Sequence, residues 1–176
     1  SPTLNVMMRA AEASARSLLR DFGEVEQLQV SRKGPGDFVS AADHRSEEII
    51  HRELSKARPD YGFLMEERGE IKGDDAESRW IVDPLDGTTN FVRGFPQFAV
   101  SIALNYRDTL DQAVVYDPFK QELFTASKGN GAALNGRRIR VSGIRNLDGA
   151  LLGTGIPFRE EQDLERYLKT MRVLLP

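Results

Sequence analysis

The sequence predicts an α+β fold, in which two helices come first, a run of antiparallel strands follows, and one more helix closes the chain. Three observations support this prediction. Apolar residues recur at helical spacing before Pro59, they gather in short runs between turn residues after it, and helical spacing returns from Leu164. With 176 residues, the chain is long enough for one domain with its own core or for most of a two-part fold.

Two helices are predicted in the first third of the chain. The first covers about residues 3–20 and ends before Gly23. Its apolar face consists of Leu4, Met7, Met8, Ala11, Ala15, Leu18 and Leu19. A loop is expected at residues 31–36, where glycine and proline gather. The second helix runs from about Ser40 to Lys56 and stops before Pro59.

Short strands are predicted between the second helix and the closing helix. The expected strands are Tyr61–Met65, Arg79–Val82, Phe98–Tyr106, Gln112–Tyr116 and Glu122–Ala126. The polar stretch Glu66–Ser78 is expected to be a surface loop. Asn135-Gly136 is a strong signal for a hairpin that joins residues 132–134 to 138–141. Residues 150–153 are a further candidate strand. The closing helix carries Leu164, Leu168, Met171 and Leu175.

Composition and charge argue against several classes of protein. The net charge of -3 gives no general attraction to nucleic acid or to a membrane surface, so neither is expected as a partner. The chain contains no cysteine, which excludes disulfides, thiolate nucleophiles and cysteine-based zinc sites, and which fits a cytoplasmic location. No apolar run approaches the length of a membrane span, and Ser1–Arg9 shows no secretory signal.

The segment Trp80–Phe91 is the most informative about chemistry. An apolar strand leads into Asp83, and Pro84 is expected to end the strand ladder there because proline donates no amide hydrogen. In a straight strand Asp83 and Asp86 would face opposite sides of a sheet. A turn through Pro84 and Leu85 would instead let both carboxylates converge.

Two converging carboxylates favour a bound divalent cation, because they otherwise repel each other. Oxygen ligands select magnesium or manganese over zinc, and the backbone carbonyl of Leu85 is a further candidate ligand. Gly87 permits a tight backbone path, and Thr88 and Thr89 are suited to begin a helix, whose first amides bind phosphate well. Like unit charges ~4 Å apart repel by roughly 4 kcal/mol near a protein surface, so a metal must mediate the approach of a phosphate ester. These residues therefore indicate metal-assisted hydrolysis of a phosphate ester.

A simple polar turn is the alternative interpretation of this segment, since proline, aspartate and glycine favour turns for local reasons. The full string is more specific than any of its pairs. Its fixed letters are Asp83, Pro84, Asp86, Gly87, Thr88 and Thr89. At average residue usage such a string matches by chance at roughly one position in 10^7 to 10^8, which favours the metal-site interpretation.

At these residues the chain resembles the inositol monophosphatase family, and the resemblance covers essentially the whole chain. The segments that carry it are Gly36–Asp43, Phe63–Glu67, Asp83–Phe91, Phe98–Ala103 and Gly153–Phe158. The resemblance implies a layered α/β/α/β/α sugar-phosphatase fold. Residues 1–150 would supply the helix pair and the antiparallel sheet with the metal site, and residues 151–176 would begin a second, mostly absent α/β part.

The resemblance also implies a role for each site residue. Glu66, Asp83, the Leu85 carbonyl and Asp86 would bind Mg²⁺, with Mn²⁺ as an alternative. The amides of Gly87 and Thr88 would hold phosphate, and Asp86 would also contact a substrate hydroxyl. The Thr88 hydroxyl, polarised by Asp43, would orient the attacking water. The substrate site would thus be formed by Glu66, Leu85, Asp86, Gly87 and Thr88.

The chain departs from the family pattern after this segment. The family has a second motif, a Trp-Asp pair followed by small residues, that supplies the last metal ligand and contacts to the sugar. Trp80 is the only tryptophan in this chain, so we expect that a C-terminal portion is missing. The family resemblance further implies a homodimer and inhibition by lithium.

Several alternatives stay open at this stage. Glu67 is an alternative ligand to Glu66, and a further alternative is that both are solvated loop charges. Asp43 has a simpler alternative role in supporting the start of the second helix, where negative charge is favourable. The expected substrate is inositol monophosphate or a related small sugar phosphate. The alternatives are fructose 1,6-bisphosphatase activity and a non-catalytic, transcription-associated interaction protein.

Overall fold

The computed structural model describes residues 1–24, 30–34, 37–159 and 161–175. Its helices are α1 (Pro2–Phe22), α2 (Ala41–Ala57), α3 (Thr88–Val92) and α4 (Leu164–Leu174). Its strands are β1 (Val30–Gly34), β2 (Asp37–Ser40), β3 (Tyr61–Met65), β4 (Gly69–Ile71), β5 (Asp75–Asp86), β6 (Ala99–Tyr106), β7 (Thr109–Asp117), β8 (Glu122–Ser127), β9 (Gly131–Leu134) and β10 (Arg137–Ile139).

The main sheet is mixed, and within the described residues it contains eight strands in the order β10-β9-β8-β7-β6-β5-β3-β4. Neighbouring strands are antiparallel except β3 and β5, which run parallel. The parallel pair arises because β4 pairs with one edge of β3 and β5 with the other. The prediction of an α+β fold is therefore confirmed, although the sheet is not purely antiparallel. The strands β1 and β2 form a separate antiparallel pair.

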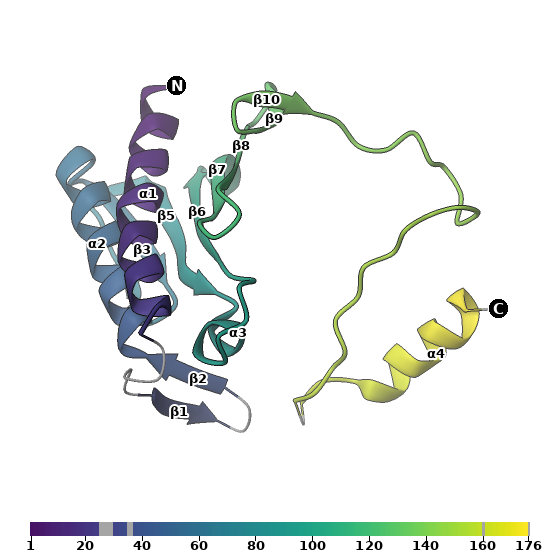
Figure 1. The fold of residues 1–176 in the computed structure, drawn as a ribbon. Coiled ribbons are helices and arrows are strands. Elements are labelled where there is room, and N and C mark those ends of the chain that lie inside the picture. Colours follow the sequence, from purple (N-terminus) through teal and green to yellow (C-terminus); the bar gives the residue numbers. More distant parts are fainter. Residues whose placement is uncertain (25–29, 35–36, 160, 176) are drawn as a thin grey trace.

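The helices α1 and α2 lie side by side against one face of the sheet (Figure 1). Alternate residues of β5 and β6 face them and are buried, as expected for a strand with one covered face. The buried apolar residues of this layer include Met7, Leu18, Ile50, Leu54, Phe63, Trp80, Val82, Val100, Ile102 and Val114. Small buried residues such as Ala10, Ala11 and Ser14 on α1 leave room for the close approach of α2. The core thus holds α2 rigidly beside the end of β5.

A cluster of aromatic rings fixes α3 at this end of the sheet. Phe91 of α3 is fully buried, and its ring centroid lies 5.5 Å from that of Phe22 and 5.0 Å from that of Phe98. Phe22 is the last residue of α1, so the short helix is tied directly to the helix layer. Buried aromatic pairs of this kind contribute roughly 0.5–1.5 kcal/mol beyond their buried area.

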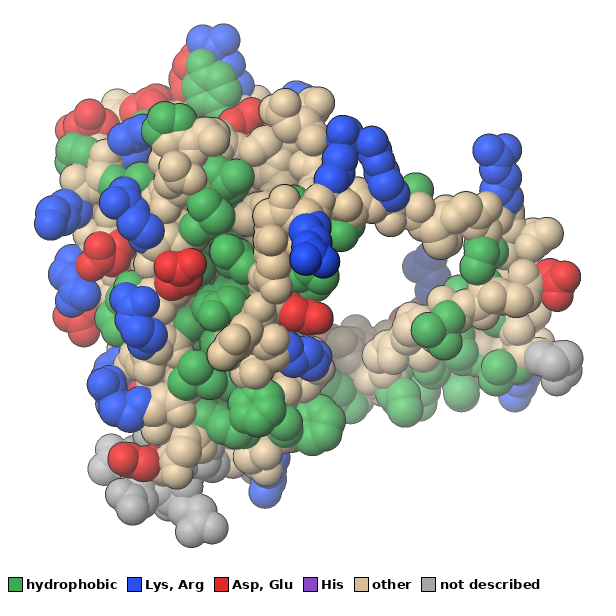
Figure 2. Space-filling view, turned by 45° about the horizontal axis from the view of Figure 1, so that its top comes forward, with side chains coloured by type: hydrophobic (Ala, Val, Ile, Leu, Met, Phe, Trp, Pro, Cys, Tyr) green, Lys and Arg blue, Asp and Glu red, His purple; other side chains and the backbone are tan. Residues whose placement is uncertain are grey.

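The chain leaves the sheet after β10. Residues 140–159 form no helix or strand, and α4 stands apart from the sheet (Figure 1). In the space-filling view this segment arches away from the body of the molecule and leaves an opening (Figure 2). The predicted closing helix is confirmed, but none of its residues is buried. The proposed domain boundary at residue 150 stays a prediction.

Two predictions about strands are wrong. Residues 150–153 form no strand, and Leu151 is 98% exposed, because this segment pairs with no strand in the part of the chain that the structure describes. The predicted loop at Glu66–Ser78 contains β4 and the start of β5. Its polar composition reflects a position at the sheet edge, where charged side chains reach solvent. The remaining predicted helices and strands are confirmed within one to three residues at most ends.

The predicted loop at residues 31–36 is also partly wrong, because Val30–Gly34 forms β1, while residues 35–36 lie outside the described part of the chain. Among the described residues, no helix has both the length and the apolar character that crossing a membrane requires.

Candidate metal centre

A bulge at the end of β5 brings Asp83 and Asp86 to the same side of the sheet. Asp83 pairs with Ser101 of β6 and Asp86 pairs with Ala99, so the two residues between the aspartates lie opposite only one residue of β6. Ser101 and Ala99 are two positions apart and face the same side, and their partners therefore do so too. The convergence predicted from the sequence is confirmed, and a strand bulge rather than a terminal turn produces it.

Pro84 and Leu85 form this bulge, and both are buried. Pro84 does not end β5 as predicted, because a bulge leaves residues unpaired and so accommodates a residue without an amide hydrogen. The Pro84 carbonyl accepts a hydrogen bond from the Ser46 hydroxyl at 2.7 Å. The Leu85 amide donates to the Asp83 carboxylate at 3.1 Å. These contacts fix the backbone between the two aspartates.

Gly87 makes the sharp turn from β5 into α3. Its φ is 94°, in the left-handed region that favours glycine. A Cβ at this position would lie 2.8 Å from the Gln97 carbonyl oxygen. Only glycine therefore fits without a backbone shift, and α3 begins at Thr88, directly beside the two aspartates.

A cleft with a volume of about 400 Å³ opens over these residues. It is lined by Glu66, Asp83, Leu85, Asp86, Gly87, Thr88, Thr89, Asn90, Phe158 and Arg159. The structure thus brings together every residue that the sequence assigned to the metal or the substrate. It adds Phe158 and Arg159 from the segment before α4, which the sequence argument did not assign to the site.

Carboxylates crowd each other in this cleft. Burial and the nearby charges of Glu66 and Asp86 raise the pKa of Asp83 to about 7, although the Leu85 amide partly opposes this. A carboxyl group with so high a pKa shows that the site disfavours the accumulated negative charge. A divalent cation would remove that cost, and all the converging donors are hard oxygens. The donor set therefore fits Mg²⁺ or Mn²⁺.

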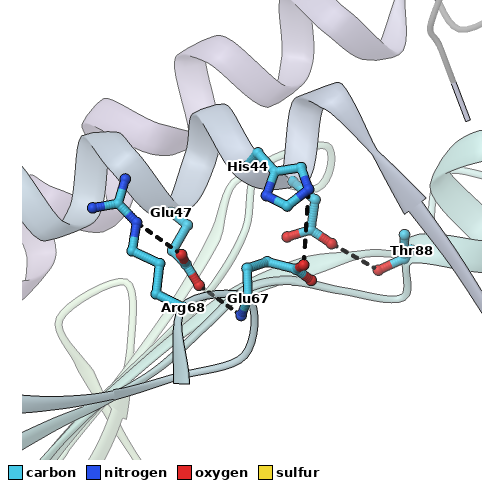
Figure 3. Close-up of polar contacts among 6 residues, drawn as sticks. His44, Glu47, Glu67, Arg68 and Thr88 are labelled. Atoms are coloured by element: carbon cyan, nitrogen blue, oxygen red, sulfur yellow. Dashed lines mark hydrogen bonds and ion pairs between the residues drawn. The ribbon is translucent and has the colours of Figure 1, made fainter. Parts of the chain in front are cut away.

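Glu66 and Glu67, the two candidates for the same ligand position, point differently. The charge of Glu66 acts on Asp83 and its side chain lines the cleft. The Glu67 side chain is only 6% exposed, and its carboxylate lies 3.9 Å from His44 Nε2 (Figure 3). Glu66 is thus the glutamate that lines the cleft and acts on Asp83, which favours Glu66 over Glu67 as the ligand.

Asp43 lies close to Glu66, to Glu67 and to Thr88. Oxygen atoms of Asp43, Glu66 and Glu67 all lie within 4.8 Å of one another, close enough to share a cation. The Thr88 hydroxyl lies 3.4 Å from the Asp43 carboxylate and 2.9 Å from the Leu85 carbonyl, to which it makes the shorter hydrogen bond. The predicted Thr88–Asp43 contact is therefore present, but it is the longer of the two.

The helix α2 contacts the site through three buried polar side chains, of which the sequence argument had named only Asp43. Asp43, Ser46 and Glu47 lie on one buried face of α2, at the spacing of one helical turn. Asp43 contacts Thr88, Ser46 binds the Pro84 carbonyl, and Glu47 accepts a hydrogen bond from the Glu67 amide at 2.8 Å. The sequence did contain a signal for this buried polar face, because Asp43, Ser46 and Glu47 stand at positions i, i+3 and i+4 of the helix.

Residues 1–175 match the sequence model described as the inositol monophosphatase family. The chain is 58% identical over 157 residues to an inositol-1-monophosphatase of Mesorhizobium japonicum, an alignment that covers 89% of this chain and 59% of that protein. It is 48% identical to the Nus factor SuhB of Pseudomonas aeruginosa, with 99% of this chain and 66% of that protein covered.

The fold is also similar to a solved structure, the extragenic suppressor protein suhB from Bartonella henselae. The TM-score is 0.95 at 52% identity, and the match covers 99% of this chain and 67% of that one. The chain thus spans roughly three fifths to two thirds of the length of these relatives.

Proposed function

This chain belongs to the inositol monophosphatase family, and we propose that the protein it comes from uses Mg²⁺ to hydrolyse inositol monophosphate and related small sugar phosphates. The observation that carries this proposal is the bulge in β5. It places Asp83 and Asp86 on one face beside Glu66, inside a cleft that ends at the start of α3.

Each site residue receives a role under this proposal. Glu66, Asp83, Asp86 and the Leu85 carbonyl hold the cation. When bound there, Mg²⁺ would neutralise the carboxylates for an anionic ester and lower the pKa of a water molecule. The amides of Gly87 and Thr88 donate hydrogen bonds to the phosphate oxygens, because amides at the start of a helix have no acceptor within the helix.

Thr88 and Asp43 orient the attacking water in this proposal. The Thr88 hydroxyl now donates to the Leu85 carbonyl at 2.9 Å. When that carbonyl serves as a metal ligand, the hydroxyl can turn to the Asp43 carboxylate, 3.4 Å away, and accept a hydrogen bond from water. Asp86 is exposed and lines the cleft, and in this proposal it also contacts a hydroxyl of the substrate. The chain has no cysteine, and the carboxylates and Thr88 serve to hold the cation and orient water, so under this proposal the water attacks the phosphate directly.

The choice of magnesium draws support from a more distant relative. A solved IMPase/NADP phosphatase, 25% identical with a TM-score of 0.59 over 65% of this chain, is described as complexed with Mg²⁺ and phosphate. Manganese has the same preference for oxygen ligands and is the alternative ion.

The substrate is the less constrained part of the proposal. A structure of an inositol monophosphatase–fructose 1,6-bisphosphatase, 28% identical with a TM-score of 0.71, keeps fructose 1,6-bisphosphate as an alternative. Comparing phosphate release from both substrates by the full-length protein would decide between them. The homodimer, the cytoplasmic location and lithium inhibition stay predictions.

A non-catalytic function is the second candidate, because relatives that are 42–48% identical are named Nus factors. Under it the protein would bind a transcription complex without hydrolysis. The carboxylates at Glu66, Asp83 and Asp86 favour retained chemistry, because a pure binding protein gains nothing from their mutual repulsion.

Phosphate release by the full-length protein with Mg²⁺ tests the proposed function. Asp86→Asn is expected to lower the rate on inositol monophosphate by about 100-fold or more, because it removes a ligand charge. Asp108→Asn makes the same chemical change at an exposed turn, and it should leave the rate unchanged. Equal rates for both variants would refute the site assignment.

A further inference from the structure

Glu47 is a buried carboxylate on α2 that the proposed reaction does not use. Only 1% of its surface is exposed. One carboxylate oxygen accepts a hydrogen bond from the Glu67 amide at 2.8 Å, and the other lies 3.2 Å from Arg68 Nε. Figure 3 shows Glu47 between the Glu67 amide and the Arg68 guanidinium, which belong to the next two residues after Glu66.

The bond to the Glu67 amide acts on the backbone that carries Glu66. That amide belongs to the peptide unit between Glu66 and Glu67, so the bond fixes the direction in which the chain leaves Glu66. Residues 66–68 form a turn between β3 and β4, where an amide has no strand ladder to bond with and needs another acceptor. Glu47 supplies this acceptor from a helix that the core holds rigid.

Stability alone does not require a carboxylate at this position. Removing one partner of a buried ion pair is costly mainly when it leaves the other charge buried and uncompensated. Arg68 keeps a substantial part of its side chain in solvent and does not need Glu47 to avoid a buried charge. An apolar side chain cannot, however, accept a hydrogen bond from the Glu67 amide. What an apolar residue could not supply is therefore the hydrogen bond from Glu47 to the turn at residues 66–68.

We propose that Glu47 is a positioning residue for the metal centre, which holds the Glu66 carboxylate in the cleft by clamping the following peptide unit to α2. The inference rests on the proposed function, because Glu66 must be a metal ligand for its position to matter. Glu47 itself does not touch the cation or the substrate.

The test compares two replacements of Glu47 in the full-length protein. Glu47→Gln keeps an oxygen that can accept a hydrogen bond from the Glu67 amide, whereas Glu47→Met has a similar volume and no such acceptor. Glu48→Met, at the exposed neighbouring position on α2, is the matched control. Mn²⁺ affinity is measured by calorimetric titration. Hydrogen exchange of a peptide covering residues 64–70 is measured by mass spectrometry in metal-free protein.

Glu47→Met is expected to weaken Mn²⁺ binding about tenfold or more and to speed hydrogen exchange of this peptide, as for the loss of other groups that orient metal ligands. Glu47→Gln should stay within about threefold of the unchanged protein, because a neutral acceptor keeps most of the hydrogen bond. Glu48→Met should match the unchanged protein in both measurements. A merely structural role would leave the Mn²⁺ affinity of folded Glu47→Met within about threefold of the unchanged protein, and that result would overturn the proposal.

Glu66→Gln separates this inference from the proposed function. If Glu66→Gln loses Mn²⁺ binding and Glu47→Met does not, the metal centre stands and the role of Glu47 is refuted. If Glu66→Gln binds Mn²⁺ normally, the proposed function fails first. Should Glu47→Met unfold below the temperature of the titration, Glu47→Asp replaces it, since its carboxylate is one methylene too short to reach the amide. Normal Mn²⁺ binding and exchange in Glu47→Asp would equally refute the clamp.

Discussion

Asp83 and Asp86 face the same side of the sheet although three positions separate them. Their partners on β6, Ser101 and Ala99, are only two positions apart, so one residue of β5 is taken up by the bulge. Without it, an aspartate would point to the opposite face. The bulge is therefore the feature that turns an acidic strand end into a candidate metal centre.

Metal binding should depend on pH near neutrality. The pKa of Asp83 is raised to about 7, so below that pH a cation must displace a proton from it. Mn²⁺ affinity is expected to fall by up to about tenfold per pH unit below 7 and to level off above it. Calorimetry in two buffers of different ionisation enthalpy should detect about one proton released per ion at pH 6 and almost none at pH 8. Equal affinity at both pH values would contradict this prediction.

The metal-free protein should lose stability as pH rises from about 4 to 7. The pKa of Asp83 is higher in the folded chain than its ordinary value of 3.8, so the folded state binds more protons in this range and is weakened as they leave. Because the side chain is partly exposed, solvent screening limits the loss to no more than about 2 kcal/mol. Thermal unfolding at pH 5 and pH 8 measures it. In Asp83→Asn this part of the pH dependence should disappear.

Gly87→Ala should disrupt the turn into α3. The alanine would be strained at a φ of 94°, and its Cβ would meet the Gln97 carbonyl oxygen at 2.8 Å. We expect a loss of about 1–3 kcal/mol in the free energy of unfolding, together with a large loss of phosphate release. Gly94→Ala is the control, because it shares a positive φ of 68° but meets no atom within 4 Å. Phosphate release as fast in Gly87→Ala as in Gly94→Ala would contradict the account.

Ser46→Ala should loosen the bulge. It removes the 2.7 Å hydrogen bond to the Pro84 carbonyl and the buried contact with the Ser14 hydroxyl. Leaving these buried groups without a partner is expected to cost about 1–3 kcal/mol, measured by urea unfolding. Ser55→Ala, at a half-buried position further along α2, should change stability by less than about 0.5 kcal/mol. Similar losses in both variants would show that Ser46 does not hold the bulge.

The sequence was sufficient to predict the elements that have a clear apolar period and the residues of one contiguous motif. Both helices of the first layer follow from the spacing of apolar residues, such as Met7 and Leu18 on α1 and Ile50 and Leu54 on α2. The cleft residues from Asp83 to Thr88 are local in sequence, so a turn or bulge alone brings them together. Glu66 was reached only through the family resemblance.

Residue patterns alone did not predict contacts between distant segments, and the Thr88–Asp43 contact was reached only through the family resemblance. Glu47 and Ser46 look like ordinary polar positions of a helix, and only the packing of α2 shows that they meet Glu67 and Pro84. Pro84 was expected to end its strand because a bulge cannot be told from a strand end by composition. The β4 strand was missed because charged edge strands and loops have similar sequences.

Diffraction from manganese-soaked crystals of the full-length protein tests the central claim most directly. The account predicts an anomalous peak within about 2.5 Å of carboxylate oxygens of Glu66, Asp83 and Asp86. It also predicts that this peak disappears in Asp83→Asn crystals and persists in Asp108→Asn crystals. A manganese peak held elsewhere, or no peak beside these three side chains, would contradict the account.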